Sequence, residues 1–253
     1  MSYFAHRSAA ERYAAARPFF HPVVLNHMRE HLGPVFPLER ALDVGCGTGQ
    51  STRILSELGR DVVGSDVSAE MLAEAAAVPN VRYVRSSAES LPFRSDAFDL
   101  LTVALAFHWF DRETFLREAR RVLCLHQWLV IYDNSFMAEM EESPTFRTWF
   151  VERYITRYPS PPRNRTPLTE DTVRSHGFEL TGHERYRNSI TFDRGQLIDY
   201  LMTQSNVIAA VEQGNESPQS VRSWLDGELG QFLNDDPGTF LFGGPITYLR
   251  LIA

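Results

Sequence analysis

The sequence predicts an α/β fold, with one doubly wound, mostly parallel sheet and helices on both of its faces. Between residues 38 and 133, short apolar runs alternate with helical patterns, as parallel strands joined by crossover helices do. The glycine cluster GCGTG at 45–49 directly follows the first apolar run, where open α/β sheets bind ligands. At 253 residues the chain suits one sizeable domain better than two.

The individual elements follow from the same pattern. Apolar runs between turn residues predict strands, and apolar residues at three- and four-residue spacing predict helices. The predicted strands are 40–45, 61–66, 81–87, 97–105 and 127–134, and the predicted helices are 50–59, 68–77 and 111–123. Ser68 is the expected N-cap of the second helix.

The alternation ends after residue 134. Residues 136–181 are rich in arginine, proline and aromatic side chains, which predicts an insertion or lid. Beyond it we expect a strand at 183–192, helices near 195–211 and 218–232, and a final hairpin at 239–253. We therefore expect a single domain, 1–253, with an N-terminal helical cap (about 1–35) and a core (about 36–133) that is completed by 182–253.

Composition excludes several classes of function. The formal charge of −7 argues against nucleic acid as the main ligand, and the absence of lysine excludes a Schiff-base mechanism. No apolar stretch approaches the roughly 18 residues of a membrane span, and no secretory signal is evident, so we expect a cytoplasmic protein. Cys46 and Cys124 are too few for a disulfide framework, and His27 and His31 lack an evident third ligand, so no metal is expected.

The glycine loop predicts a nucleotide-like cofactor. Gly45, Gly47 and Gly49 permit positive φ and a close backbone approach. Asp66 follows Gly45 by 21 residues, close to the spacing at which an acid binds ribose hydroxyls. The spacing is G-x-G-x-G and not the G-x-G-x-x-G of pyrophosphate sites, and Asp43 would repel phosphate but suit a sulfonium or ammonium group. A cationic nucleoside fits better than a dinucleotide.

These residues carry a family resemblance. LDVGCGTGQST, GSDVSAEML, SSAESLPFRSDAFDLL and RVLCLHQWLVIYD resemble the class I S-adenosylmethionine-dependent methyltransferases of type 11, in particular the small-molecule subgroup similar to trans-aconitate methyltransferase. The resemblance covers about 36–133. It implies a Rossmann-like, seven-stranded sheet with a terminal antiparallel strand, S-adenosyl-L-methionine as the cofactor and S-adenosyl-L-homocysteine as its product.

The resemblance also implies where the methionine part of the cofactor lies. Its expected contacts are the loop residues Gly45, Cys46, Gly47 and Thr48, together with Ala104 at the end of the strand predicted at 97–105.

The nucleoside part is expected at the next two strand ends. Asp66 is expected to hold the ribose and Val67 and Met71 to flank the adenine, while Ala88 and Glu89 close the adenine pocket.

The N-terminal segment and one turn complete the comparison. RYAAARPFFHP resembles the opening helix of the subgroup and would place Tyr13 and Arg17 near the cofactor. Ser86 and Ser87 replace a common Gly-Asp pair, which weakens the expected adenine contacts. Leu-His-Gln at 125–127 replaces a common Pro-Gly-Gly turn, so His126 is expected to adopt positive φ.

Candidate acceptor residues follow the strand predicted at 97–105. Phe107 and Trp109 are expected to line the acceptor pocket, and His108 either to act as a base or to orient the acceptor. Trp109 can equally belong to the core, and His108 can be a hydrogen-bonded edge residue. Methyl transfer is an in-line displacement, so positioning is the protein's main task.

The predicted insertion suggests the acceptor's charge. Residues 147–194 hold nine arginines and six acidic side chains, which would attract an anionic acceptor, and Tyr154, Tyr158 and Tyr186 would suit an aromatic one. We expect oxygen methylation of a carboxylate or hydroxyl of a small molecule, with carbon or nitrogen methylation next. A non-catalytic S-adenosylmethionine-binding protein and a nicotinamide-dependent oxidoreductase are alternatives, and the sequence leaves the oligomeric state open.

Overall fold

The computed structural model describes residues 6–33, 37–164, 166–234 and 236–252. The chain forms two compact units, each built from several segments. The first comprises Met1–Pro18, Ser135–Pro162 and Arg187–Gly243, and the second Phe19–Asn134, Arg163–Tyr186 and Gly244–Ala253. The predicted insertion is therefore divided between the two units at Pro162.

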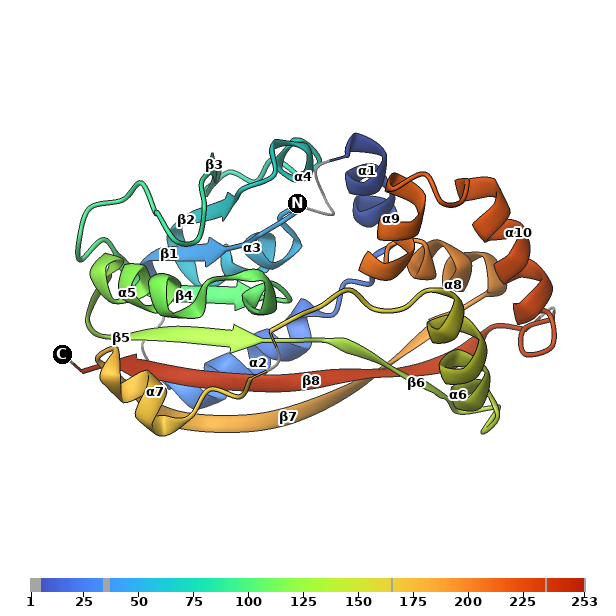
Figure 1. Ribbon diagram of the computed structural model, residues 1–253. Helices are drawn as coiled ribbons and strands as arrows, with labels where there is room; N and C mark the ends of the chain where they lie inside the picture. The colour runs from blue at the N-terminus through green and yellow to red at the C-terminus, as the bar shows by residue number, and fades with distance from the viewer. Residues whose placement is uncertain (1–5, 34–36, 165, 235, 253) are drawn as a thin grey trace. The chain divides into compact units, whose positions relative to one another are not determined.

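The second unit contains the predicted parallel sheet (Figure 1). Its strands are β1 (Leu38–Val44), β2 (Gly59–Asp66), β3 (Val81–Arg85), β4 (Phe98–Ala104), β5 (Leu123–Tyr132) and parts of β7 (Phe178–Phe192) and β8 (Gly238–Leu251). The order is β3-β2-β1-β4-β5-β8, and β7 pairs with β8. Neighbours from β3 to β5 are parallel, whereas β5 and β8 are antiparallel. The expected Rossmann-like, mostly parallel sheet with an antiparallel strand is confirmed, but it has eight strands and not seven, because an additional strand, β6 (Ser135–Met140), pairs with β8.

Helices cover both faces of this sheet. They are α2 (His21–Leu32), α3 (Gln50–Leu55), α4 (Ala69–Ala73), α5 (Arg112–Val122) and α7 (Glu170–Ser175). Successive strand residues divide between two apolar clusters: Leu42 packs in one with Phe115 of α5, and Ala41 in the other with Leu25 of α2 and Ile54 of α3. This alternation is the two-residue period of a sheet buried on both faces.

Two local predictions had different outcomes. His126 has φ +67°, as the missing glycine turn predicted. The final hairpin was wrong, because β8 runs unbroken from Gly238 to Leu251. Gly243 and Gly244 do not form a turn. Gly244 instead allows β8 to pass close to the backbone carbonyl of Asp133, with which a Cβ at this position would collide.

The first unit is mainly helical. It contains α1 (Arg7–Ala16), β6 (Ser135–Met140), α6 (Phe146–Trp149), the π-helical turn η2 (Phe150–Ile155), α8 (Arg194–Leu201), α9 (Ser205–Glu212) and α10 (Pro218–Leu229). β6 was not predicted, and it pairs antiparallel with the start of β8. Tyr154 and Tyr158 are buried in the aromatic core of this unit, so the prediction that they line a pocket is not supported.

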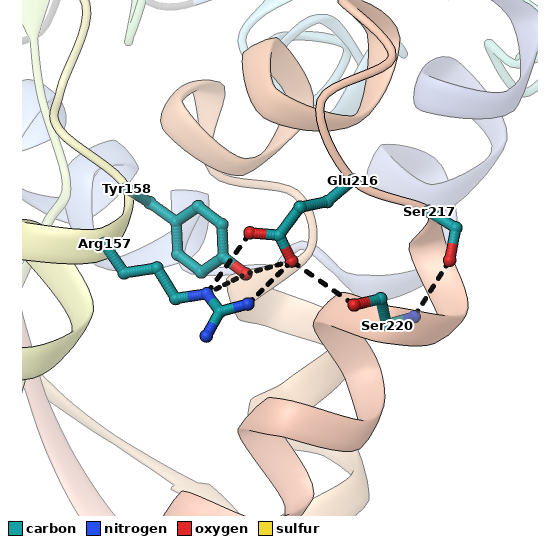
Figure 2. Close-up of polar contacts among 5 residues, drawn as sticks. All are labelled: Arg157, Tyr158, Glu216, Ser217 and Ser220. Carbon is teal, nitrogen blue, oxygen red and sulfur yellow. Dashed lines mark hydrogen bonds and ion pairs between the residues drawn. The ribbon is translucent and has the colours of Figure 1, made fainter.

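A polar network fixes the end of the η2 segment within this unit. Glu216 accepts hydrogen bonds from Arg157 at 2.9 Å, from Tyr158 at 3.2 Å and from Ser220 at 3.4 Å (Figure 2). Ser217 caps α10 through the backbone N–H of Ser220. None of the helices in the described part of the chain combines the length and apolar character that a membrane span requires.

Candidate functional site

The glycine loop connects β1 to α3 at the carboxyl end of the central strand. Gly45, Gly47 and Gly49 all have positive φ, at +72°, +54° and +75°. The backbone N–H of Gly45 donates to the carbonyl of Ser65 at 2.8 Å, which ties the loop to β2. A Cβ on Gly45 would lie 2.6 Å from the Cβ of Ala106, so the loop also packs closely on the chain after β4. Glycine is required at this position for both its φ and its size.

Asp43 lies beneath this loop and is fully buried. Its Oδ2 accepts hydrogen bonds from the hydroxyls of Ser51 at 2.5 Å and Thr52 at 2.7 Å, and its Oδ1 accepts one from Thr102 at 2.9 Å. Burial raises the pKa of Asp43 to about 6, against the lowering effect of the three hydroxyls. The carboxylate faces the interior and not solvent, so it positions the loop and can act on a ligand only through space.

Asp66 joins the glycine loop to the start of α4. Its Oδ2 accepts the backbone N–H of Gly47 at 2.8 Å, and its Oδ1 accepts that of Ser68 at 2.8 Å. Burial raises the pKa of Asp66, while these backbone hydrogen bonds oppose the shift. Because a carboxylate oxygen has two acceptor directions, each oxygen can still accept a hydrogen bond from a ligand hydroxyl.

The predicted adenine residues occupy two neighbouring segments. Val67 is 55% exposed at the end of β2, whereas Met71 and Ala88 are buried. Glu89 accepts the backbone N–H of Asp111 at 3.0 Å and so connects this segment to the start of α5. Ser68 caps α4 as predicted, accepting the N–H of Met71 at 3.2 Å.

The chain after β4 forms a short 3-10 helix, η1 (Phe107–Trp109). Ala104 is buried at the strand end, and Leu105 has φ +57°, so the chain turns sharply before η1. Phe107 is buried in a core cluster and lines no exposed surface. Trp109 is 38% exposed, and its ring lies 4.6 Å from that of His108. Of the three predicted acceptor residues, Phe107 thus belongs to the core, whereas Trp109 is partly exposed.

A charged group that was not predicted from the sequence follows β5 at the same edge of the sheet. Asp133 directly follows β5, and burial raises its pKa while the charges of Arg163 and Arg112 lower it. The guanidinium of Arg163 lies over the Trp109 ring at 5.3 Å. Arg112 donates to the carbonyl of Asn164 at 2.5 Å. The sequence did contain a signal for this residue, because Asp133 is an acidic residue at the end of a buried strand, at the edge of the sheet where ligands bind.

Other arginines between residues 147 and 194 form ion pairs with acidic side chains. Within the first unit, four of them form ion pairs: Arg147 with Glu139, Arg153 with Glu228, Arg157 with Glu216 and Arg194 with Asp226. Tyr186, in the second unit, is buried and donates to the carbonyl of Asp133 at 2.9 Å. Arg163, by contrast, lies over the ring of Trp109 in η1.

The remaining predicted residues have local roles that the structure defines. Tyr13 and Arg17 belong to the first unit, where the Arg17 guanidinium lies 4.6 Å from the Tyr13 ring and donates to the carbonyl of Thr203 at 2.9 Å. Burial raises the pKa of the Cys46 thiol, which disfavours thiolate chemistry. Thr48 is buried in the loop. The described residues include no group of three or more His, Cys, Asp or Glu side chains suited to a metal ion.

Comparison with known proteins identifies the family. A methyltransferase domain model matches residues 42–131. A methyltransferase of Mycobacterium bovis, itself uncharacterized, is 35% identical over 181 residues, which is 70% of this chain and 70% of the relative. Other curated relatives match over a smaller share, and the chain spans 49% and 36% of the length of two of them.

Solved structures show the same fold. A protein from Anaeromyxobacter dehalogenans, solved as a candidate type II methyltransferase, has a TM-score of 0.66 at 20% identity, covering 93% of this chain and 95% of that one. Phosphoethanolamine N-methyltransferase 2 of Haemonchus contortus, solved with phosphomonomethylethanolamine and S-adenosylhomocysteine, has a TM-score of 0.57 at 18% identity, covering 100% of this chain and 60% of that one. The chain belongs to the class I S-adenosylmethionine-dependent methyltransferases of type 11.

Proposed function

We propose that this chain transfers the methyl group of S-adenosyl-L-methionine to a small-molecule acceptor, by oxygen methylation of a carboxylate or hydroxyl. Carbon or nitrogen methylation is the next candidate. The main support for the cofactor assignment is the position of Asp66, whose two carboxylate oxygens accept hydrogen bonds from the N–H groups of Gly47 and Ser68. This carboxylate sits between the glycine loop and α4, where a ribose would need its hydroxyls bound.

The cofactor would extend along the carboxyl edge of the sheet. The loop residues Gly45 to Thr48 and Ala104 would contact its methionine part, and Asp66 its ribose. Val67, Met71, Ala88 and Glu89 would surround the adenine. The exposure of Val67 and the burial of Met71 suit a ring held between a surface residue and the interior. Tyr13 and Arg17 remain predicted contacts of the cofactor.

The charge of the loop region supports a sulfonium cofactor. Asp43 and Asp66 lie at the carboxyl ends of adjacent strands, and among the described residues no arginine charge acts on the pKa of either carboxyl group. A pyrophosphate would bring like charge to this site, whereas a sulfonium would be attracted. The complex of the Haemonchus enzyme with S-adenosylhomocysteine supports this cofactor for the shared fold.

The acceptor would lie beside η1. His108 would orient it or take its proton, and Trp109 would supply an aromatic wall. Holding the acceptor atom, the methyl carbon and the sulfur in line lowers the barrier by roughly 7 to 11 kcal/mol in well-positioned systems. The net charge of −7 supports a small molecule and not a nucleic acid as acceptor.

Transfer of labelled methyl groups tests this function. Purified protein is incubated with methyl-labelled S-adenosylmethionine and a panel of small carboxylic acids, alcohols, phenols and amines, and products are identified by mass. We expect an O-methylated product. Cofactor binding without transfer to any acceptor would favour the non-catalytic alternative, and products methylated only on carbon or nitrogen would contradict the oxygen assignment.

A further inference from the structure

Asp133 lies in register with the chain that leaves β4. Ala104 pairs with Tyr132 in the parallel ladder of β4 and β5, so Asp133 follows at the level of Leu105. The backbone N–H of Leu105 donates to the carbonyl of Tyr132 at 3.0 Å. The carboxyl group therefore belongs to the same edge of the sheet as the glycine loop and η1, where the proposed methyl transfer would occur.

The backbone of Asp133 is held from two sides. Its N–H donates to the carbonyl of Pro245 at 3.1 Å, and its carbonyl accepts the Tyr186 hydroxyl at 2.9 Å. Gly244 packs so closely on the Asp133 carbonyl that a Cβ on this glycine would collide with it. These contacts fix the backbone from which the Asp133 side chain projects.

Arg163 adds positive charge near this carboxyl group. Its guanidinium lies over Trp109, and its neighbour Asn164 donates its N–H to the carbonyl of His108 at 3.4 Å. Arg112 in turn donates to the carbonyls of Asn164 and Thr166. Arg163 and Arg112 thus favour the ionised form of the Asp133 carboxyl group, against the effect of burial, which raises its pKa.

We propose that Asp133 receives the proton of a hydroxyl acceptor during methyl transfer. The acceptor oxygen forms the new bond to the methyl carbon as the carbon–sulfur bond breaks, and the hydroxyl proton passes to the Asp133 carboxylate. The products are the methyl ether, S-adenosylhomocysteine and neutral Asp133, which then releases the proton to solvent. His108 orients the acceptor in this account. The inference rests on the proposed function.

This assignment narrows the acceptor class to neutral hydroxyl compounds. A carboxylate is already ionised near neutral pH and needs no base, and a negative Asp133 would repel it. An alcohol or phenol gains from losing its proton as the bond forms, by about 100-fold or more in rate.

Matched acceptors and variants test the assignment. The probes are p-cresol and benzyl alcohol as hydroxyl acceptors, with p-toluate and benzoate as their carboxylate counterparts. The variants are Asp133→Asn, Asp133→Glu and His108→Gln, and Asp171→Asn on the exposed surface of α7 is the control that makes the same change in charge. Affinity for S-adenosylmethionine is measured in every variant by calorimetry, which separates a failure to bind cofactor from a failure of proton transfer.

We expect the wild type to methylate at least one hydroxyl probe, with kcat falling as pH is lowered and Asp133 becomes protonated. Among the described residues, the charges of Arg163 and Arg112 lower the pKa of Asp133, and the Tyr186 hydroxyl donates to its backbone carbonyl. Asp133→Asn should lower kcat about 100-fold and lose this acidic limb with cofactor affinity unchanged, and Asp133→Glu should recover part of both. His108→Gln should mainly raise KM for the acceptor.

Several results would overturn the assignment. These are methylation of neither hydroxyl probe, methylation of the carboxylates alone, or an Asp133→Asn enzyme that keeps the wild-type kcat and acidic limb. If the wild type does not bind S-adenosylmethionine, the proposed function itself is refuted.

Discussion

The buried carboxyl group of Asp43 makes the stability of the second unit depend on pH. Asp43 is fully buried and accepts hydrogen bonds from Ser51, Thr52 and Thr102. The Asp43→Asn variant replaces the titratable group by a neutral amide of nearly the same shape. The hydroxyls that face the new amide N–H₂ can rotate to accept its hydrogen bonds, and the amide oxygen can still accept from a hydroxyl, so the loop can keep its contacts.

The magnitude follows from the pKa of Asp43, which burial raises from 3.8 to about 6. A difference of about 2.2 pKa units corresponds to about 3 kcal/mol. The folded state binds the proton more tightly than the unfolded state, so the stabilisation is complete below about pH 4 and is lost as pH rises through about 6. The free energy of unfolding of the wild type, relative to Asp43→Asn, should therefore fall by about 3 kcal/mol between about pH 4 and pH 7.

Urea unfolding at a series of pH values, followed by circular dichroism, measures this difference. Asp171→Asn is the control, since it removes one carboxylate from the exposed surface of α7. The reasoning is refuted if the difference between wild type and Asp43→Asn stays constant over the whole pH range.

Two further substitutions test the loop and the first unit. Gly45→Ala should lower the free energy of unfolding by about 2 kcal/mol and weaken cofactor binding about tenfold, because φ of Gly45 is +72° and the new Cβ would lie 2.6 Å from that of Ala106. Gly227→Ala in α10 is the matched control, because the new Cβ would meet no neighbouring group within 4 Å. This variant should raise the free energy of unfolding by about 1 kcal/mol in the same denaturation and titration assays. Glu216→Gln should cost about 1 kcal/mol at pH 7, since Glu216 accepts hydrogen bonds from Arg157 and Tyr158. The Arg157 contact lowers the pKa of Glu216 below 4.5, so its stabilisation is present above that pH and lost below it; an equal cost at pH 7 and pH 3 would contradict this.

The parallel sheet could be predicted because its determinants are local. The strands are short apolar runs whose successive residues pack in apolar clusters on opposite faces of the sheet, and the glycine loop follows directly from the first of them. The same holds for His126, whose positive φ depends only on the turn that contains it. The final hairpin failed for the opposite reason, because β8 is fixed by pairing with strands far away in sequence, which overrides the local turn signal of Gly243 and Gly244.

The acceptor side of the site depends on such distant contacts. Asp133 matters because folding brings it near Arg112 and Arg163, and no spacing in the sequence indicates that they meet. Tyr154 and Tyr158 seemed suited to a pocket because they lie in a loop-rich, aromatic segment, but a helical unit built from three separate segments buries them. The sequence could thus predict the cofactor side of the candidate site in more detail than the acceptor side.

We propose that the glycine loop and Asp66 hold S-adenosylmethionine. Calorimetric titration of the protein with S-adenosylmethionine, S-adenosylhomocysteine and NADH, alongside Asp66→Ala, tests it most directly. The account predicts micromolar binding of the first two ligands, no binding of NADH, and a loss of about tenfold or more in affinity in the variant, because the ribose would lose two charge-assisted hydrogen bonds. Binding of NADH alone, or unchanged affinity in Asp66→Ala, would contradict it.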